Sequence, residues 1–274
     1  GYQVETLPKA LDEETLCQNI KDVSILGIRS KTQVTKKVLQ NANKLKAIGA
    51  FCIGTDQMDL LALQQNGVAA FNAPYQNTRS VVELALGEMI ILTRGIFDKS
   101  DNLHKGIWDK SAKNSNEVRG KTLGIIGYGN IGSQLSVLAE SLGMNVIFYD
   151  IFEKLPLGNV KKAKSLNELL KISDIISVHV SGDKANKSLI GEKEFAQMKD
   201  GVIFINLSRG FIVNIDALGR FIKSGKIRGA AVDVFPEEPK SKDEPFKSEL
   251  QGLPNVILTP HIAGSTQEAQ KNII

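Results

Sequence analysis

Short apolar runs alternate with amphipathic segments along nearly the whole chain. Such runs are typical of buried strands, whereas apolar residues spaced three and four apart predict helices with one buried face. Strands are predicted at 23–28, 46–53, 68–71, 123–126, 146–149, 175–180, 202–206, 230–235 and 256–259. Helices are predicted at 35–42, 59–65, 81–96, 131–142, 166–171, 192–198 and 216–224. This alternation predicts an α/β fold with parallel sheets.

The chain of 274 residues is long enough for two domains of about 100–200 residues each. Residues 1–76 form the first part of a smaller domain, and 77–263 form a doubly wound larger one. The helix at 81–96 is predicted to link them, with Ser80 as its N-cap and Glu83 completing a capping box. Residues 101–116 are polar and predicted irregular; Trp108 there is a candidate for local packing or for a subunit interface.

The most specific pattern lies in residues 121–150. A predicted strand runs into Gly127, Gly129 and Gly132 with G-x-G-x-x-G spacing, and a helix and a second strand follow. In such a unit the first glycine permits a tight turn, the second lets a pyrophosphate approach the backbone, and the third lets the helix pack on the strand. The helix N-terminus offers free N–H groups to phosphate. We therefore predict a dinucleotide site; a βαβ unit that only turns tightly is the alternative.

Asp150 ends the second strand of this unit, 18 residues after Gly132. A carboxylate in this position binds the ribose hydroxyls, and its charge repels a 2′-phosphate. The cofactor is therefore predicted to be NAD rather than NADP. The alternative is a strand-end acid that faces solvent.

Composition narrows the class of protein. Hydrophobic residues make up 42% and charged residues 23%, as in ordinary globular proteins, and the net charge is +4. The lysines are spread along the chain, so nucleic acid is not an expected partner. Cys17 and Cys52 are isolated and lack metal-ligand spacing, which favours reduced thiols in a cytoplasmic protein without a metal. The segment 81–92 is too short and too charged to span a membrane.

Four polar residues follow predicted strand ends in the larger domain: Arg209, Asp233, Glu238 and His261. Strand carboxyl ends converge in a doubly wound sheet, where ligands bind. A histidine can move the proton of a substrate hydroxyl, a carboxylate can orient that histidine, and an arginine can grip a carboxylate with two donors. The set predicts hydride exchange between NAD and a small hydroxy acid. Taken singly, each residue also has an ordinary structural explanation.

The smaller domain has its own strand-end cluster. Arg29 and Lys31 follow the strand at 23–28, and the backbone of Ile53 and Gly54 follows the next strand. These groups are predicted to bind an anionic substrate; a solvated loop is the alternative.

Several stretches resemble the D-isomer-specific 2-hydroxyacid dehydrogenases. They are Gly127-Tyr-Gly-Asn-Ile-Gly132, Asn206-Leu-Ser-Arg-Gly210, Ala230-Ala-Val-Asp-Val-Phe-Pro-Glu-Glu-Pro239 and Thr259-Pro-His-Ile-Ala-Gly264. Residues 29–32, 51–55, 71–80 and 264–270 look like the phosphoglycerate dehydrogenase branch of that family. The resemblance implies a Rossmann NAD-binding domain inserted in a smaller flavodoxin-like substrate domain, to which 264–274 returns, truncated. It also implies homo-oligomers that pair through the NAD-binding domain.

The resemblance further implies the roles of individual residues. Arg209 and Glu238 are expected in the active site, with His261 as the proton donor. Substrate contacts are expected from Arg29, Lys31, Ile53, Gly54, Asn77 and Arg209. The cofactor is expected to contact Gly127, Gly129, Asn130, Ile131, Gly132, Asp150, His179, Leu207, Ser208, Arg209, Asp233, His261, Ile262, Ala263 and Gly264.

The sequence departs from the family pattern in two places. Ser181 stands where a proline is common, and Leu207 where a small residue is common; both are expected to alter the cofactor fit without removing it. The family also begins before the equivalent of Gly1 and continues past Ile274, so we expect the chain to be incomplete.

The expected reaction is the NAD-dependent oxidation of 3-phosphoglycerate to 3-phosphohydroxypyruvate, which leads to serine. The alternatives are another 2-hydroxy acid, such as glycerate or lactate, or an NAD-sensing corepressor-like binding protein.

Overall fold

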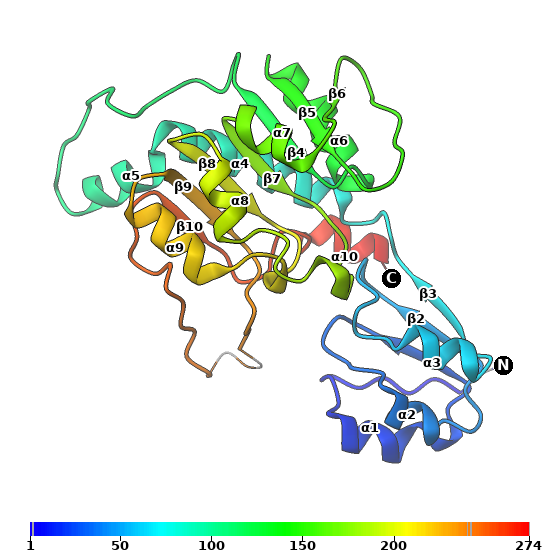
Figure 1. Cartoon of the computed structure of the whole chain (residues 1–274). Helices are drawn as coiled ribbons and strands as arrows, with labels where there is room; N and C mark the ends of the chain where they lie inside the picture. The colour runs from blue at the N-terminus through cyan, green and yellow to red at the C-terminus, as the bar shows by residue number, and fades with distance from the viewer. Residues whose placement is uncertain (2, 240, 242, 274) are drawn as a thin grey trace. The chain divides into compact units, whose positions relative to one another are not determined.

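The computed structural model describes residues 1, 3–239, 241 and 243–273. It divides into two compact units, one of Gly1–Asn77 with Gln267–Ile274 and one of Thr78–Thr266 (Figure 1). Both units carry parallel sheets covered by helices, so the predicted α/β class is confirmed. Ile274, the last residue of the expected return segment, lies outside the described residues.

The smaller unit contains a parallel sheet in the order β1-β2-β3. Polar side chains cap its helices: Asp12, Thr35 and Asp59 each accept a hydrogen bond from the backbone N–H three residues later. Its buried core is separate from those of the larger unit. The elements are α1 (Glu13–Asn19), η1 (Ile20–Asp22), β1 (Ile25–Ile28), α2 (Lys36–Gln40), β2 (Ala47–Ala50), α3 (Leu60–Gln65), β3 (Ala69–Asn72) and α10 (Gln267–Ile273).

The larger unit contains a seven-stranded parallel sheet in the order β10-β9-β8-β7-β4-β5-β6. The chain runs from β4 outward to β6 and then resumes at β7 on the other side of β4. This reversal between β4 and β7 is the topological switch point at which Rossmann folds bind dinucleotides. The strands are β4 (Thr122–Ile126), β5 (Asn145–Tyr149), β6 (Lys161–Lys162), β7 (Ile175–Val178), β8 (Val202–Asn206), β9 (Ile227–Val232) and β10 (Val256–Leu258).

Helices cover both faces of this sheet (Figure 1). Because side chains alternate along a strand, β8 places Ile203 and Ile205 in one buried core and Val202 and Phe204 in the other. α4 (Thr78–Arg94) and α6 (Asn130–Ser141) contribute to the first core. The second core receives α7 (Leu166–Ile172), α8 (Glu192–Gln197) and α9 (Ile215–Lys223). The remaining elements are α5 (Ile96–His104), η2 (Lys184–Asn186) and η3 (Gly210–Ile212).

The long helix differs from the prediction at both ends. α4 begins at Thr78, so Ser80 lies within it and its hydroxyl pairs with Thr266 Oγ1 at 2.9 Å instead of capping the helix. Glu83 binds Arg79 on the exposed surface. Gly95, with φ of 63°, separates α4 from α5, because a left-handed residue ends an α-helix. Residues 101–104, predicted irregular, belong to α5.

β9 also differs, since it spans Ile227–Val232 rather than 230–235. Arg228 interrupts the apolar run but lies at the start of the strand, where its guanidinium reaches the carbonyl of Asn114. Asp233 and the residues after it are therefore outside the strand, at its carboxyl end.

Candidate active site and cofactor site

The three glycines at the junction of β4 and α6 have different surroundings. Gly127 has φ of 93°, and a Cβ there would lie 2.6 Å from the His179 carbonyl oxygen. A Cβ on Gly132 would overlap the carbonyl oxygen of Gly127, so α6 can approach β4 only without a side chain at this position. A Cβ on Gly129 would have no other atom within 4 Å. Gly127 and Gly132 are therefore required by packing, whereas Gly129 borders space that a ligand can enter.

α6 begins at this turn without a side-chain cap. Gly129 is its N-cap, and Asn130 and Ile131 are its first residues, so no N-cap side chain accepts a hydrogen bond from the first turn. An uncapped helix N-terminus beside open space suits the diphosphate of a dinucleotide.

Asp150 holds the turn from the neighbouring strand. Its Oδ2 accepts a hydrogen bond from Tyr128 N at 2.7 Å, and its Oδ1 accepts one from Phe152 N at 2.9 Å. Tyr128 is buried, stacks on Phe148 with centroids 3.8 Å apart, and donates to or accepts from Ser136 Oγ at 2.8 Å. Asp150 thus has a structural role, and each of its oxygens retains lone pairs for ribose hydroxyls.

His179 lies on the opposite side of the Gly127 turn. Its Nε2 is 2.8 Å from Ser177 Oγ, while its Nδ1 is buried and has no hydrogen-bond partner among the described residues. Burial lowers the pKa of the imidazole to about 4, so the ring is neutral at physiological pH. His179 therefore adds no positive charge to the predicted phosphate site.

The predicted catalytic residues follow three adjacent strands. Arg209 follows β8, Glu238 lies in the segment after β9, and His261 follows β10, and these strands are neighbours in the sheet. His261 Nδ1 lies 2.9 Å from Glu238 Oε2. Arg209 is close enough for its charge to lower the pKa of both partners. The structure thus brings together the three residues that the sequence grouped.

His261 is fixed mainly through its backbone. Its φ is 55°, a left-handed conformation that a non-glycine residue adopts at a cost of order 1–3 kcal/mol. The N–H of His261 donates to the Asp233 carbonyl at 2.8 Å. The Asp233 carboxylate accepts hydrogen bonds from Thr259 Oγ1 at 2.6 Å and from the N–H groups of Ile262 and Ala263 at 2.8 Å each. Asp233 therefore anchors the whole segment 259–263 on both sides of the histidine.

The Glu238–His261 contact shifts both pKa values. The hydrogen bond to Glu238 raises the pKa of His261, and burial opposes this shift. Burial raises the pKa of Glu238, but the hydrogen bond and charge of His261 outweigh it, so the net pKa is lowered. Both shifts favour an imidazolium–carboxylate pair. Glu238 Oε1 also accepts from Phe235 N at 3.2 Å. Because Nδ1 of His261 is engaged by Glu238 Oε2, Nε2 is the ring nitrogen available for proton transfer.

The Arg209 segment is held by the buried amide of Asn206. Its Oδ1 accepts from Ser208 N at 3.1 Å and from Ser208 Oγ at 2.8 Å, and its Nδ2 donates to the Arg209 carbonyl at 3.2 Å. Leu207 is buried in the core. A Cβ on Gly210 would overlap the backbone of Phe235 and Pro236, so only glycine lets the segments carrying Arg209 and Glu238 lie this close.

The predicted substrate residues other than Arg209 lie in the smaller unit. Arg29 and Lys31 are exposed just after β1. Asn72 Nδ2 donates to the Ile53 carbonyl at 2.8 Å and so fixes the loop that contains Gly54. Asn77 is the last residue of this unit's first segment, and its Oδ1 is buried without a partner among the described residues.

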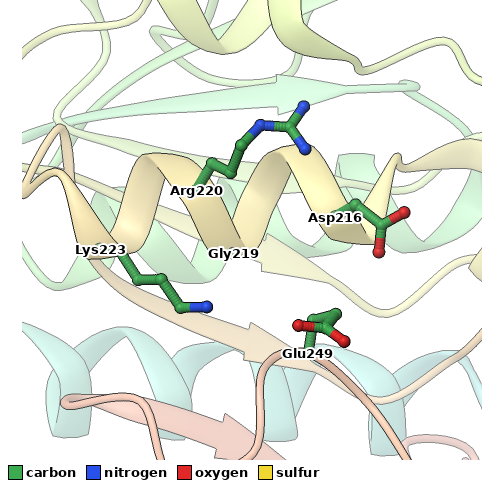
Figure 2. A pocket seen from close by; sticks show the side chains of 5 residues that line it. All are labelled: Asp216, Gly219, Arg220, Lys223 and Glu249. Carbon is green, nitrogen blue, oxygen red and sulfur yellow. The ribbon is translucent and has the colours of Figure 1, made fainter.

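Two pockets lie away from these residues. One of about 320 Å³ is lined by Asp216, Gly219, Arg220, Lys223 and Glu249 of α9 and the segment before β10 (Figure 2). Another of about 250 Å³ lies near the amino ends of the strands and is lined by Lys121, Asp174 and Arg228, among others. No predicted site residue lines either pocket, so neither changes the assignment based on hydrogen bonds.

Three residues were not given a role in the sequence analysis but support the site, and a fourth, Glu88, is a buried acid. Tyr128 and Asn206 hold the two turns, and Thr259 joins Asp233 to the His261 segment. Glu88 lies buried in α4. Glu88 could be noticed in the sequence because it is a charged residue on the apolar face of the predicted helix at 81–96.

Known proteins match this chain along its length. A D-3-phosphoglycerate dehydrogenase of Haemophilus influenzae is 54% identical over 274 residues, which are 100% of this chain and 67% of that protein. One from Dictyostelium discoideum is 52% identical over 273 residues, with the same shares. The structure of a D-lactate dehydrogenase from Aquifex aeolicus, in complex with NAD and lactic acid, superposes with a TM-score of 0.87 at 30% identity. The match covers 94% of this chain and 81% of that one.

The model of the D-isomer specific 2-hydroxyacid dehydrogenase NAD-binding domain matches residues 86–263. This range contains the glycine turn, Asp150 and the Arg209–Glu238–His261 set, and NAD is the cofactor. The chain therefore belongs to the D-isomer specific 2-hydroxyacid dehydrogenase family of NAD-dependent oxidoreductases.

Proposed function

We propose that this chain catalyses the NAD-dependent oxidation of 3-phosphoglycerate to 3-phosphohydroxypyruvate, a reaction that supplies carbon for serine. The observation that carries the chemistry is the 2.9 Å contact between His261 Nδ1 and Glu238 Oε2 beside Arg209. The substrate assignment is supported by relatives at 54% and 52% identity that are named D-3-phosphoglycerate dehydrogenase.

NAD, when bound, would supply the acceptor for the hydride that leaves the carbinol carbon. Neutral His261 takes the hydroxyl proton on Nε2 while Nδ1 donates to Glu238, whose negative charge stabilises the imidazolium that forms. The Arg209 guanidinium holds the substrate carboxylate with two parallel N–H donors. In the reverse direction, protonated His261 returns the proton to the carbonyl oxygen.

The cofactor residues keep the roles predicted for them as part of this proposal. Gly129, Asn130 and Ile131 present backbone N–H groups to the diphosphate, and Asp150 binds the ribose. The residues beside the nicotinamide are those of the three strand-end segments after β8, β9 and β10: Leu207, Ser208, Arg209, Asp233, His261, Ile262, Ala263 and Gly264. His179, being neutral, acts there as a hydrogen-bonding group.

In the smaller unit, Arg29 and Lys31 bind the substrate phosphate, and the backbone of Ile53 and Gly54 with the Asn77 side chain binds the rest of the substrate. The two positive charges of these side chains match the charge of about −1.5 to −2 that a phosphate carries at neutral pH.

A homo-oligomer is part of the proposal. Ile96, Phe97, Leu103, Ile107 and Trp108 expose between 43% and 77% of their surfaces along α5 and the following loop. Aromatic and apolar clusters of this kind are typical of subunit interfaces.

Helices of the described residues lack the combined length and apolar character needed to cross a bilayer. A cytoplasmic location stays a prediction from the free thiols of Cys17 and Cys52.

The decisive experiment measures NADH oxidation with a panel of 2-oxo acids: 3-phosphohydroxypyruvate, hydroxypyruvate, glyoxylate and pyruvate. We expect the highest kcat/KM for the phosphorylated acid. A preference for pyruvate or hydroxypyruvate would contradict the substrate assignment but would still support the proposed dehydrogenase reaction. NADH binding without turnover of any acid would favour an NAD-sensing binding protein instead.

A further inference from the structure

Glu88 is a buried acid that the reaction described above does not use. It lies on the face of α4 that also carries Ala85, Met89 and Leu92 and that packs into the core beside Ala231 and Ala263. The residue is 2% exposed. Both carboxyl oxygens are buried, and neither has a hydrogen-bond partner among the described residues.

An ionised carboxylate in this setting is strongly unfavourable. Burial without a cation or hydrogen-bond donor costs far more for the charged form than for the neutral acid. Burial and the negative charge of Asp233 raise the pKa of Glu88 to about 8. Glu88 is therefore protonated at neutral pH.

Asp233 is the acid whose charge acts on Glu88. The other charged groups on the elements around α4 are engaged elsewhere. Asp98 of α5 accepts from Asn255 N, Glu140 of α6 accepts from Asn159 N, and Arg228 of β9 donates to the Asn114 carbonyl. In α5, Lys99 pairs with Asp109 and Asp101 pairs with Lys105. His104 of α5 is exposed, and β8 carries no charged residue. Arg209, in the segment after β8, pairs electrostatically with Glu238.

The contacts of Asp233 connect Glu88 to the reaction. Asp233 is 0% exposed, and its carboxylate holds the segment 259–263 on which His261 adopts its left-handed backbone. A second negative charge in the same core would repel Asp233 or draw in a counter-charge or water. Either response displaces the anchor of the His261 segment.

We propose that Glu88 is a positioning residue that keeps the Asp233-anchored His261 segment in place while it is protonated, so that loss of its proton sets the upper pH limit of the dehydrogenase reaction. The effect on the rate rests on the proposed function, whereas the protonation of Glu88 and its effect on stability do not. The oxidation rate then rises with pH as His261 becomes neutral and falls again as Glu88 ionises.

The effect on folding has a defined sign. The pKa of Glu88 is about 8 in the folded chain and has a model value of 4.5. The folded state therefore holds a proton that the unfolded state has released between these values, and stability is lost as pH rises through this range. Glu88→Gln removes this loss because glutamine stays neutral.

The experiment compares wild type with Glu88→Gln and, as a matched control, Glu83→Gln on the exposed side of the same helix. The measurements are the ratio of oxidation rates at about pH 9.5 and pH 7, and Tm at several pH values between about 5 and 9.5. For wild type and Glu83→Gln we expect the rate to fall up to roughly tenfold per pH unit above about pH 8, the limit for a single proton. For Glu88→Gln we expect the fall to disappear and Tm to gain on wild type as pH rises from about 5 to 8.

Two further measurements keep the test decisive. Difference infrared spectroscopy of the wild-type chain should show a protonated carboxyl band at about pH 7 that is lost by about pH 9.5; this needs no variant and no turnover. Glu88→Met, which also lacks a titratable group, should reproduce the pH profile of Glu88→Gln. The same alkaline limb in all variants would overturn the link to catalysis. The absence of the carboxyl band at neutral pH, or a Tm difference independent of pH, would overturn the neutral acid itself.

Discussion

His261 and Glu238 form a hydrogen-bonded pair, with Nδ1 and Oε2 2.9 Å apart, although the two residues are 23 positions apart in sequence. The two residues come from segments after adjacent strands, and the backbone of His261 is held left-handed by Asp233. The pair combines a raised pKa of the imidazole with a lowered pKa of the carboxyl. The positions of these residues after the strands therefore set the pKa of His261, and that pKa is expected to set the pH dependence of the reaction.

The first prediction concerns this pH dependence. Reduction of a 2-oxo acid needs protonated His261, so its rate should fall as pH rises through the raised pKa, and oxidation should rise over the same range. Glu238→Gln removes the charge that favours imidazolium and should move both midpoints to lower pH. Rates of reduction measured across pH for both chains test this, and a midpoint unchanged in Glu238→Gln would rule out the pairing as its cause.

The second prediction concerns proton transfer itself. His261→Ala should lower kcat by roughly 10²–10⁴-fold, the usual share of general acid–base catalysis. NADH binding, followed by fluorescence titration, should change little, because the proposed diphosphate and ribose contacts lie in the 127–150 segment. A large loss of NADH affinity with normal kcat would instead make His261 a binding residue.

Cofactor choice provides the third prediction. Asp150→Ala should weaken NAD binding and narrow the preference over NADP, because the carboxylate no longer repels a 2′-phosphate. The variant should also lose stability, since Tyr128 N and Phe152 N lose their acceptor. Tm and the two dissociation constants should be measured together. Equal affinities of the wild-type chain for NAD and NADP would assign the choice to another residue.

The fourth prediction concerns the substrate phosphate. Arg29→Ala with Lys31→Ala should raise KM for 3-phosphohydroxypyruvate about tenfold or more per residue, as expected for charge-assisted hydrogen bonds of ~1.5–3 kcal/mol each. KM for unphosphorylated hydroxypyruvate should change little. Lys36→Ala with Lys37→Ala, two further cations in α2, is a matched control that should leave both values unchanged. Equal increases for both acids would show that the pair does not read the phosphate.

The fifth prediction concerns assembly. Trp108 is 77% exposed, and Ile107 is 53% exposed. Trp108→Ser with Ile107→Ser should shift the oligomer towards smaller species in sedimentation velocity, because the change removes apolar area from the proposed interface. A matched change of Ile151 and Phe152 to serine, at another exposed apolar site, should leave the oligomer intact. An unchanged mass in the first variant would place the interface elsewhere.

Much of the architecture could be predicted from local pattern. Buried parallel strands read as continuous apolar runs, and the glycine spacing after β4 correctly predicts a tight turn followed by a helix, because both signals arise from residues close in sequence. The same reasoning correctly grouped Arg209, Glu238 and His261, since the carboxyl ends of parallel strands meet at one edge of a sheet. The division between α4 and α5 was missed because the left-handed Gly95 was overlooked inside an apolar helical pattern.

Tertiary structure alone decided which atoms meet. Asp150 was predicted to bind ribose, but the fold also makes its carboxylate the acceptor for Tyr128 N. Asp233 is predicted to line the cofactor, and the fold also makes its carboxylate the anchor of the His261 segment 26–30 residues away. The proposed protonation of Glu88 depends on its burial and on the lack of a hydrogen-bond partner for its carboxyl oxygens among the described residues. Side-chain identity sets what a group can donate, accept or titrate, but its protonation and partners depend on the dielectric and the neighbours that only packing supplies.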